Sequence, residues 1–403
     1  MKPYFLLIIL FLLACENSES INDPVTIDYQ TQLQQLVNES WEEYSATKPN
    51  YPGGYSLQII SGGNDYYAAS GELSESNDQI HFRGASTTKT FTAAGILLLH
   101  QRGLLNINHY ITDPIPNNGE SYVPDTENFN IPYKNQITIK LLLQNRAGVF
   151  DLINTNIPDT VSAEYAGYRY ADYIIEGLGQ TTHTFTTEEM LGVLAKHNLC
   201  YFEPGESFHY SDTGFNLLGY IIERVSGQRY DEFITENLLT PNGLFETTFP
   251  NRGDDISIPE PTAPGNIFYQ GEVIDVTENN RSMHFAEGNV ITTPYDLTKW
   301  IMKLLKGEAG IESRYIEYLM MDCQPTFESH QYYGLGCTFT PGLGYGHNGG
   351  TMGYFIVSRY DPEMDLAFTL FTNTWDYDAI LSDIYTQLFY MYDLAKEAKE
   401  LFQ

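Results

Sequence analysis

Ser86 and Lys89 stand three residues apart at the start of a long apolar segment. The segment 84–99 opens on small residues and continues as a run with the composition of a buried helix. Residues three apart share one face of a helix, so the hydroxyl of Ser86 and the amine of Lys89 can meet. A serine in the first turn also lies near the positive end of the helix dipole, which favours an oxyanion nearby. The spacing predicts a hydroxyl nucleophile with an activating amine, although a capping serine followed by a solvated lysine has the same pattern.

Two later segments carry groups that such a pair needs. Tyr210 lies on a tight loop ahead of a helix-like run at 215–226, and a phenol close to a lysine can relay a proton. The segment 344–354 is rich in glycine, which lets the backbone approach a ligand closely and leaves N–H groups unobstructed. This segment contains His347, Asn348, Gly349 and Gly350. Each feature alone also fits a simpler role, packing for the tyrosine and a plain turn for the glycines.

In chain order, these segments resemble the S-x-x-K, Y-x-N and K-T-G or H-x-G motifs of the serine β-lactamase and penicillin-binding-protein superfamily. The likeness is to the branch that contains class C β-lactamases, D-alanyl-D-alanine carboxypeptidases and esterases. Stretches at 103–116, 137–149 and 286–300 are also similar to family segments. The resemblance implies a serine hydrolase that forms an acyl-enzyme on an ester or amide, with a D-alanyl-D-alanine-type carboxypeptidase or an esterase as the specific forms.

The resemblance also implies a role for each matching residue. Ser86 is the nucleophile that becomes acylated, Lys89 helps to remove its proton, and Tyr210 passes a proton to the leaving group. The backbone N–H groups of Ser86 and Gly350 form the oxyanion hole. The residues expected on the substrate side are Asp212, His347, Asn348 and Gly349.

The chain departs from the family pattern at two of these positions. Asp212 stands where the motif has Asn, and its carboxylate favours the ammonium form of Lys89 and repels an anionic substrate. Asn348 stands where the motif has Thr, which removes a hydroxyl that the family uses to hold a substrate carboxylate. Two alternatives therefore stay open: a β-lactamase, and a catalytically silent lipoprotein of the same fold that binds cell-wall peptide.

Strand-like and helix-like segments divide the chain into an α/β part and a helical part. The segments 55–59 and 66–70 alternate as a hairpin, and the segments 350–358 and 366–373 are also rich in β-forming residues. We expect an α/β (α+β) fold in which one antiparallel sheet is built from both termini with flanking helices. In the hydrolase domain, 31–403, the α/β part then covers about 45–105 and 285–403, and a mostly helical inserted subdomain covers about 106–284. Helices are expected at 31–44, 139–145, 187–197, 215–226 and 379–401.

The first residues predict an exported protein. An apolar run at 4–13 follows Lys2, and it is too short to span a bilayer. The sequence Leu-Leu-Ala-Cys that ends at Cys15 resembles the lipobox of bacterial lipoproteins, whose cysteine is acylated. We expect a signal peptide at 1–14, a polar tether at 15–30 and a membrane-anchored lipoprotein, periplasmic or at the cell surface.

The composition limits the partners. The formal net charge is −31, from 21 basic and 52 acidic side chains, so the surface repels nucleic acid and anionic membrane. Any membrane contact then comes through the lipid anchor only, and the partner is a small-molecule or peptide substrate such as a peptidoglycan stem peptide. The histidines show no H-E-x-x-H or clustered pattern, so neither a metal nor a cofactor is expected. Cys323 and Cys337 could form a disulfide, which the sequence cannot establish.

Overall fold

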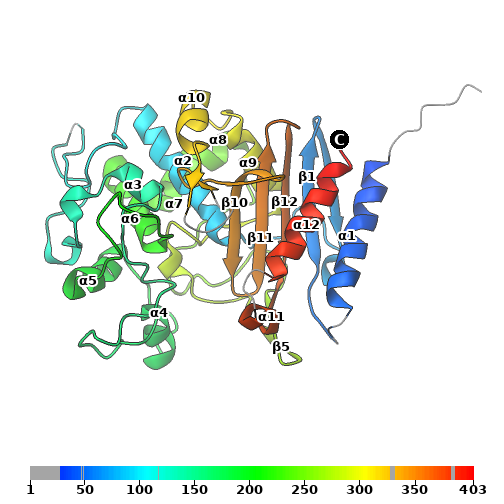
Figure 1. Cartoon of the computed structure of the whole chain (residues 1–403), viewed down its shortest axis with the longest axis horizontal. Coiled ribbons are helices and arrows are strands. Elements are labelled where there is room, and N and C mark those ends of the chain that lie inside the picture. Colours follow the sequence, from blue (N-terminus) through cyan, green and yellow to red (C-terminus); the bar gives the residue numbers. More distant parts are fainter. Residues whose placement is uncertain (1–27, 47, 49, 117, 327–331, 383–385) are drawn as a thin grey trace, which may run out of the picture.

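An eight-stranded antiparallel sheet forms the centre of the molecule, and both ends of the chain contribute to it (Figure 1). This computed structural model describes residues 28–46, 48, 50–116, 118–326, 332–382 and 386–403. The strand order is β2-β1-β12-β11-β10-β9-β8-β7. The strands are β1 (Tyr55–Ser61), β2 (Asn64–Ala69), β7 (Gln324–Pro325), β8 (Tyr332–Tyr333), β9 (Thr338–Thr340), β10 (Gly344–Thr351), β11 (Tyr354–Asp361) and β12 (Leu366–Thr372).

The junction between the two ends of the chain lies inside this sheet, between its second and third strands. Strand β1 pairs with β12, with Tyr55 opposite Thr372 and Ser61 opposite Leu366. Every residue of β12 is buried, and its sequence is a nearly continuous apolar run without alternation. Such a run is typical of a strand that is covered on both faces.

Helices cover both faces of the sheet. The helices α1 (Tyr29–Ser45) and α12 (Thr386–Glu400) pack on one face, where Leu33 and Val37 join Leu370 and Leu394 in one core (Figure 1). The spacing of the buried residues of α1 is close to one helical turn, and the Asp28 carboxylate caps its first turn by accepting from Thr31 N–H at 3.1 Å. The helices α2 (Thr88–Gln101) and α9 (Pro294–Leu305) belong to the larger core on the opposite face.

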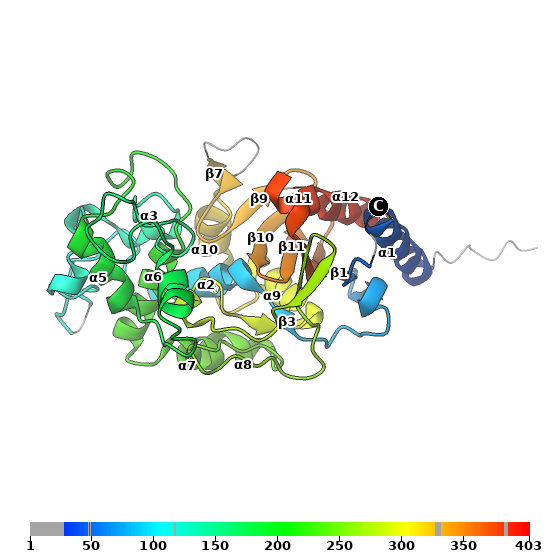
Figure 2. The same ribbon diagram turned by 90° about the horizontal axis from the view of Figure 1, so that it is seen from below.

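A helical block extends from one end of the sheet, and α1 lies at the other end in both views (Figures 1 and 2). Its helices are α3 (Ile139–Leu143), α4 (Tyr170–Asp172), α5 (Thr187–His197), α6 (Asp212–Ser226), α7 (Tyr230–Ile234) and α8 (Thr240–Asn242). A hairpin that the sequence did not predict, β4 (Asn266–Tyr269) and β5 (Glu272–Asp275), lies beside α11, and β4 pairs in parallel with β13 (Thr374–Asp376). The remaining elements are β3 (Phe82–Arg83), paired with β6 (Ile291–Thr292), and the short helices α10 (Ser313–Tyr315) and α11 (Tyr377–Ser382).

The structure confirms the α/β fold with an antiparallel sheet and flanking helices, and it corrects three boundaries. The expected strand 350–358 is the end of β10 and the start of β11, because the chain turns at Met352 and Gly353, whose φ is +83°. The expected helix 379–401 is divided between α11 and α12. The expected tether ends earlier than residue 30, because α1 already begins at Tyr29.

The predictions for the N-terminus lie mostly outside the described residues. Cys15 and the segment 1–14 belong to the part of the chain that the structure does not describe. Within the described part, we find no helix long and apolar enough to cross a membrane. Cys200, Cys323 and Cys337 are free thiols, so the disulfide considered for the last two is not formed here.

Candidate active site

Ser86 lies on a tight turn between a strand and a helix. It is the middle residue of a 3₁₀ turn, Ala85–Thr87, that joins β3 to α2, so it precedes the α-helix instead of lying in its first turn as expected. Ala85 has a φ of +50°, a left-handed conformation that costs a residue with a side chain about 1–2 kcal/mol. The hydroxyl groups of Thr87 and Thr88 donate to the carbonyls of Gly84 and Ala85 at 2.8 and 2.7 Å. These bonds hold the turn and leave Ser86 partly exposed.

Lys89 lies directly beneath Ser86 and is completely buried. Its Nζ is 3.3 Å from Ser86 Oγ, 2.6 Å from Asp212 Oδ1 and 3.1 Å from Glu287 Oε2. It also donates to the backbone carbonyl of Glu287 at 3.0 Å. A buried ammonium is stable only when it is paired and hydrogen-bonded, and here two carboxylates and a carbonyl fulfil that condition.

The two carboxylates determine the protonation of Lys89. Burial alone would lower the pKa of Lys89, but the charges of Asp212 and Glu287 outweigh burial and raise the pKa above its usual range. Burial and the nearby Glu287 raise the pKa of Asp212, while Lys89 opposes that change. The resting form of Lys89 is therefore the ammonium.

A chain of polar side chains extends from Asp212 into the helical block. Asp212 is the first residue of α6, whose N-cap Ser211 accepts from Gly214 N–H at 3.2 Å. The second oxygen of Asp212 accepts from Asn154 Nδ2 at 2.7 Å, and the same amide donates to Asp151 at 2.9 Å. Burial and the charge of Asp212 raise the pKa of Asp151 to about 7.

Glu287 is bound at both carboxylate oxygens. One oxygen contacts Lys89, and the other lies 2.5 Å from Nδ1 of His284. Burial, together with the charge of Arg281, lowers the pKa of His284 well below its usual value, so the ring is neutral. The oxygen and nitrogen atoms of Asp212, His284 and Glu287 lie within 4.8 Å of one another, a spacing that could suit a metal ion. The ammonium of Lys89, however, already contacts both carboxylates of this group.

Tyr210 covers the outer side of Lys89. Its ring centroid is 4.8 Å from Lys89 Nζ, and its hydroxyl is close enough to Ser86 to interact with it. Burial and the charge of Asp212 raise the pKa of Tyr210 well above its usual value, although Ser86 opposes this, so the side chain is a neutral phenol. Tyr210 is partly exposed and can exchange protons with a bound substrate.

Strand β10 forms the opposite wall of the site. A Cβ at Gly349 would lie 2.4 Å from the Gly84 carbonyl oxygen and 3.2 Å from Ala85 Cβ, so this position needs glycine for the strand to pack on the turn that carries Ser86. The next residue, Gly350, is exposed. A Cβ there would meet only the ring of Phe355.

His347 is a neutral, buried part of the same wall. Its Nδ1 donates to the carbonyl of Asn348 at 2.6 Å, and its Nε2 lies 3.3 Å from the hydroxyl of Tyr333. Burial, with a smaller contribution from Lys89, lowers the pKa of His347 to about 3. A histidine in this state offers a substrate no positive charge.

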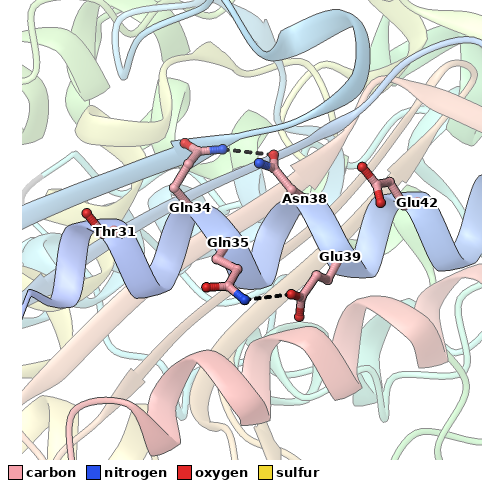
Figure 3. A pocket seen from close by; sticks show the side chains of 6 residues that line it. All are labelled: Thr31, Gln34, Gln35, Asn38, Glu39 and Glu42. Atoms are coloured by element: carbon pink, nitrogen blue, oxygen red, sulfur yellow. Dashed lines mark hydrogen bonds between the residues drawn. The ribbon is translucent and has the colours of Figure 1, made fainter.

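An open depression also occurs on the exposed face of α1, far from this constellation (Figure 3). Helix α1 packs on the sheet face opposite α2, so the depression is separated from Ser86 by the sheet. It is lined by Thr31, Gln34, Gln35, Asn38, Glu39 and Glu42. These amides and acids are hydrogen-bonded along the helix and carry none of the chemistry described above.

The model of the family described as Beta-lactamase matches residues 38–388. The chain belongs to the Beta-lactamase family. It is a family of serine hydrolases with a common fold.

Penicillin-binding protein 4* of Bacillus subtilis (strain 168) is 31% identical over 172 residues, which cover 42% of this chain and 31% of that protein. Protein flp of Staphylococcus aureus (strain NCTC 8325 / PS 47) is 28% identical over 231 residues, 56% of this chain and 39% of that protein. The chain thus spans about a third of the length of the curated relatives that it matches.

Solved structures share the fold over nearly the whole chain. D-amino acid amidase from Ochrobactrum anthropi SV3, complexed with L-phenylalanine amide, has a TM-score of 0.70 at 22% identity and covers 92% of this chain and 98% of its own. A D-stereospecific amidohydrolase from Streptomyces sp. has a TM-score of 0.69 at 24% identity, with 86% and 94% covered. At these identities the likeness shows the fold of the Beta-lactamase family alone.

The structure brings most of the residues expected for a Beta-lactamase family site together, with one exception. The residues that contact one another around Ser86 and Lys89 are Tyr210, Asp212, His347 and Gly349, and Gly350 follows Gly349 in the same strand. Asn348 does not belong there, because its amide accepts from Arg359 at 2.7 Å and donates to Tyr392 at 2.5 Å. Neighbouring residues of a strand point to opposite faces, and Asn348 faces the layer of α12 while Gly349 faces Ser86. The expectation that Asn348 lines the substrate side is therefore wrong for this structure.

Five residues of the site have no counterpart among the sequence predictions: Glu287, His284, Asp151, Asn154 and Tyr333. Glu287 does carry a signal in the sequence, since it is the charged residue of a stretch that otherwise consists of uncharged residues, 286–291. Almost fully buried acids are rare unless they are paired, so such a residue is a candidate for an ion pair. Nothing in the local sequence indicates that Lys89 is its partner.

Proposed function

We propose that the protein is a serine hydrolase that forms an acyl-enzyme on Ser86 from an ester or amide substrate. The observation that supports this most directly is the geometry around Ser86 Oγ. Lys89 Nζ lies 3.3 Å away, the Tyr210 hydroxyl is close enough to interact with it, and Gly349 packs against the turn that carries it. A nucleophile, an amine and a phenol in contact are the parts that acyl transfer requires.

In this proposal, the free amine of Lys89 takes the proton of Ser86 as its oxygen attacks the carbonyl carbon. The N–H groups of Ser86 and Gly350 stabilise the oxyanion, at about 3–4 kcal/mol for each donor. Tyr210 hands a proton to the departing group, and the proton it loses is replaced from Lys89, 4.8 Å from its ring centroid. Water then hydrolyses the acyl-enzyme by the reverse sequence of proton transfers.

The substrate class in this proposal is a small ester, amide or peptide, such as a D-alanyl-D-alanine-type stem peptide of the cell wall. The amidases among the structural neighbours support an amide as one form of it. The N-terminal residues support an exported lipoprotein that is anchored through Cys15, periplasmic or at the cell surface. The net charge of −31 argues against nucleic acid as a partner.

The test is labelling of Ser86 with a fluorophosphonate probe, followed by turnover of a substrate panel. We expect labelling of the wild type, no labelling of Ser86→Ala, and a loss of turnover of about 10⁶-fold in that variant. Ser226→Ala, which lies at the end of α6 away from the site, is the matched control and labels normally. The panel contains p-nitrophenyl esters, D-amino acid amides, a D-alanyl-D-alanine peptide and a chromogenic cephalosporin. A protein that labels nowhere and turns over no member of the panel contradicts the proposal, and turnover of the cephalosporin alone identifies a β-lactamase.

A further inference from the structure

The ammonium of Lys89 has an acceptor for each of its three hydrogens. Nζ donates to the Glu287 carbonyl at 3.0 Å, to Glu287 Oε2 at 3.1 Å and to Ser86 Oγ at 3.3 Å. Asp212 Oδ1 lies 2.6 Å from the same nitrogen as an ion-pair partner. Two of the three hydrogen bonds thus go to Glu287, and the bond to Ser86 is the longest.

Glu287 is fixed in place from several sides. It is 1% exposed, and its outer oxygen contacts His284 at 2.5 Å. The preceding residue is tied to both long helices of this region, because Ala286 N–H donates to Asn216 Oδ1 at 2.9 Å and the Ala286 carbonyl accepts from Thr92 at 2.5 Å. These contacts hold the backbone before Glu287 and the outer oxygen of its carboxylate, so they oppose a turn of the side chain away from Lys89.

We propose that Glu287 is a positioning residue of this site, which holds the amine of Lys89 beneath Ser86 and sets the pH at which that amine becomes free to accept the serine proton. The inference rests on the proposed function. It assigns a role to a residue that follows Ser86 by about two hundred positions and belongs to none of the three motifs.

In the proposed acylation, each proton that leaves one group is accepted by another. Lys89–NH₃⁺ first releases one proton to solvent and becomes Lys89–NH₂. The amine then takes the proton of Ser86 while the bond from Ser86 Oγ to the substrate carbonyl carbon forms. When the carbon–leaving-group bond breaks, that proton passes through Tyr210 to the leaving group, and acylation leaves Lys89 again as the amine.

The charge of Glu287 acts on the first of these events. An opposite charge at 3.1 Å stabilises the ammonium, so removing the carboxylate makes the free amine available at lower pH. The other titratable groups that face Lys89 and Glu287 remain in such a variant, and loss of the Glu287 charge also lowers the pKa of Asp212, which keeps one carboxylate beside Lys89. The groups that remain are Asp151, Asp212, Tyr210, Tyr230, Arg281, His284, Tyr333 and His347.

The experiment measures the single-turnover rate of Ser86 labelling by the fluorophosphonate from about pH 6 to about pH 10. In the wild type we expect the rate to rise throughout this range, because two carboxylates hold the ammonium. In Glu287→Gln we expect the rise to level off about one to three pH units lower. Glu287→Asp, which keeps the charge on a shorter side chain, is the second variant, and its profile should lie between the two.

The matched control is Glu189→Gln. Glu189 also pairs with a histidine, His183, at 2.9 Å, but it lies on α5 outside the site. Its profile should coincide with that of the wild type. If Glu287→Gln labels more slowly at every pH with an unshifted profile, Glu287 has a structural role only and the inference is overturned. If Glu287→Gln does not fold, an unshifted profile of Glu287→Asp overturns it. If the wild type is not labelled at Ser86, the proposed function fails, and this inference fails with it.

Discussion

The two walls that meet at Ser86 differ in the way they carry charge. On the side of α2 and α6, Lys89 lies between Asp212 and Glu287, and all three side chains are buried. On the side of β10, His347 is neutral, and Gly349 and Gly350 present only backbone. Of these residues, the ionised ones thus lie on the wall that would carry the proposed proton transfers, and backbone dipoles form the wall where the proposed oxyanion would develop. The two walls should therefore respond differently to substitution, in protonation and stability on one side and in geometry on the other.

The charged wall should show the largest effect. We expect Lys89→Met to lower the acylation rate by about 10²–10⁴-fold, because the general base is lost. The same variant leaves two buried carboxylates without their cation, which should lower the free energy of unfolding by about 3–5 kcal/mol. Labelling kinetics and urea unfolding at neutral pH measure the two effects.

The control for this variant is Lys306→Met, because Lys306 pairs with Asp365 at 3.0 Å on the surface. An exposed pair of this kind contributes less than about 1 kcal/mol. Equal losses of stability in the two variants would show that burial of the Lys89 cluster carries no special cost.

The backbone wall can be tested with two neighbouring glycines. Gly349→Ala places a Cβ 2.4 Å from the Gly84 carbonyl oxygen, so β10 and the turn that carries Ser86 must separate, and we expect kcat to fall about 10²-fold. Gly350→Ala keeps its N–H group, and its Cβ meets only the ring of Phe355 at 3.2 Å. We expect its kcat to stay within about threefold of the wild type, since no backbone contact is strained. Similar losses in both variants would contradict the assignment of Gly349 as the packing contact.

The smallest effect that we expect is on the pH dependence of the free energy of unfolding, and it comes from Asp151, behind Asp212 on the charged wall. The pKa of Asp151 is raised from 3.8 in the unfolded chain to about 7, so between these values the folded protein binds more protons than the unfolded chain. The free energy of unfolding should therefore fall as pH rises from about 4 to about 7. In Asp151→Asn this slope should be shallower. Urea unfolding at several pH values measures it, with the exposed Asp125→Asn as a control that keeps the wild-type slope.

Local signals made part of the fold predictable. Helix α5 spans Thr187–His197 as expected, because Thr186 caps its first turn and Asn198 ends it in the left-handed conformation. The strands β7, β8 and β9 have only two or three residues each, too few for an alternating pattern, and their pairing depends on tertiary contacts. The turn at Met352 and Gly353 was missed because the segments on both sides are equally rich in β-forming residues.

The site was predictable where short spacing carries the chemistry. Ser86 and Lys89 are three residues apart, and the order of Tyr210 and His347 along the chain follows a known pattern. The pairing of Lys89 with Glu287 joins positions 198 residues apart, and only packing of the segment 286–290 against α2 brings them together. Asn348 was placed wrongly for a different reason. Its position in the motif does not show on which face of β10 its side chain lies, and the alternation of the strand directs it to Arg359, away from Ser86.

The pairing of β1 with β12 has a consequence for the order of events during synthesis. Strand β1 pairs with β2 on one side and with β12 on the other. Because Tyr55 lies opposite Thr372, the second partner of β1 exists only when nearly the entire chain has been made. Contacts between such distant positions close large loops, and sheets of this kind form slowly. Until β12 arrives, β1 and β11 each present an open edge to which other chains can add. A chain truncated before residue 366 should therefore aggregate and remain unlabelled, even though it contains Ser86, Lys89, Tyr210 and Gly350.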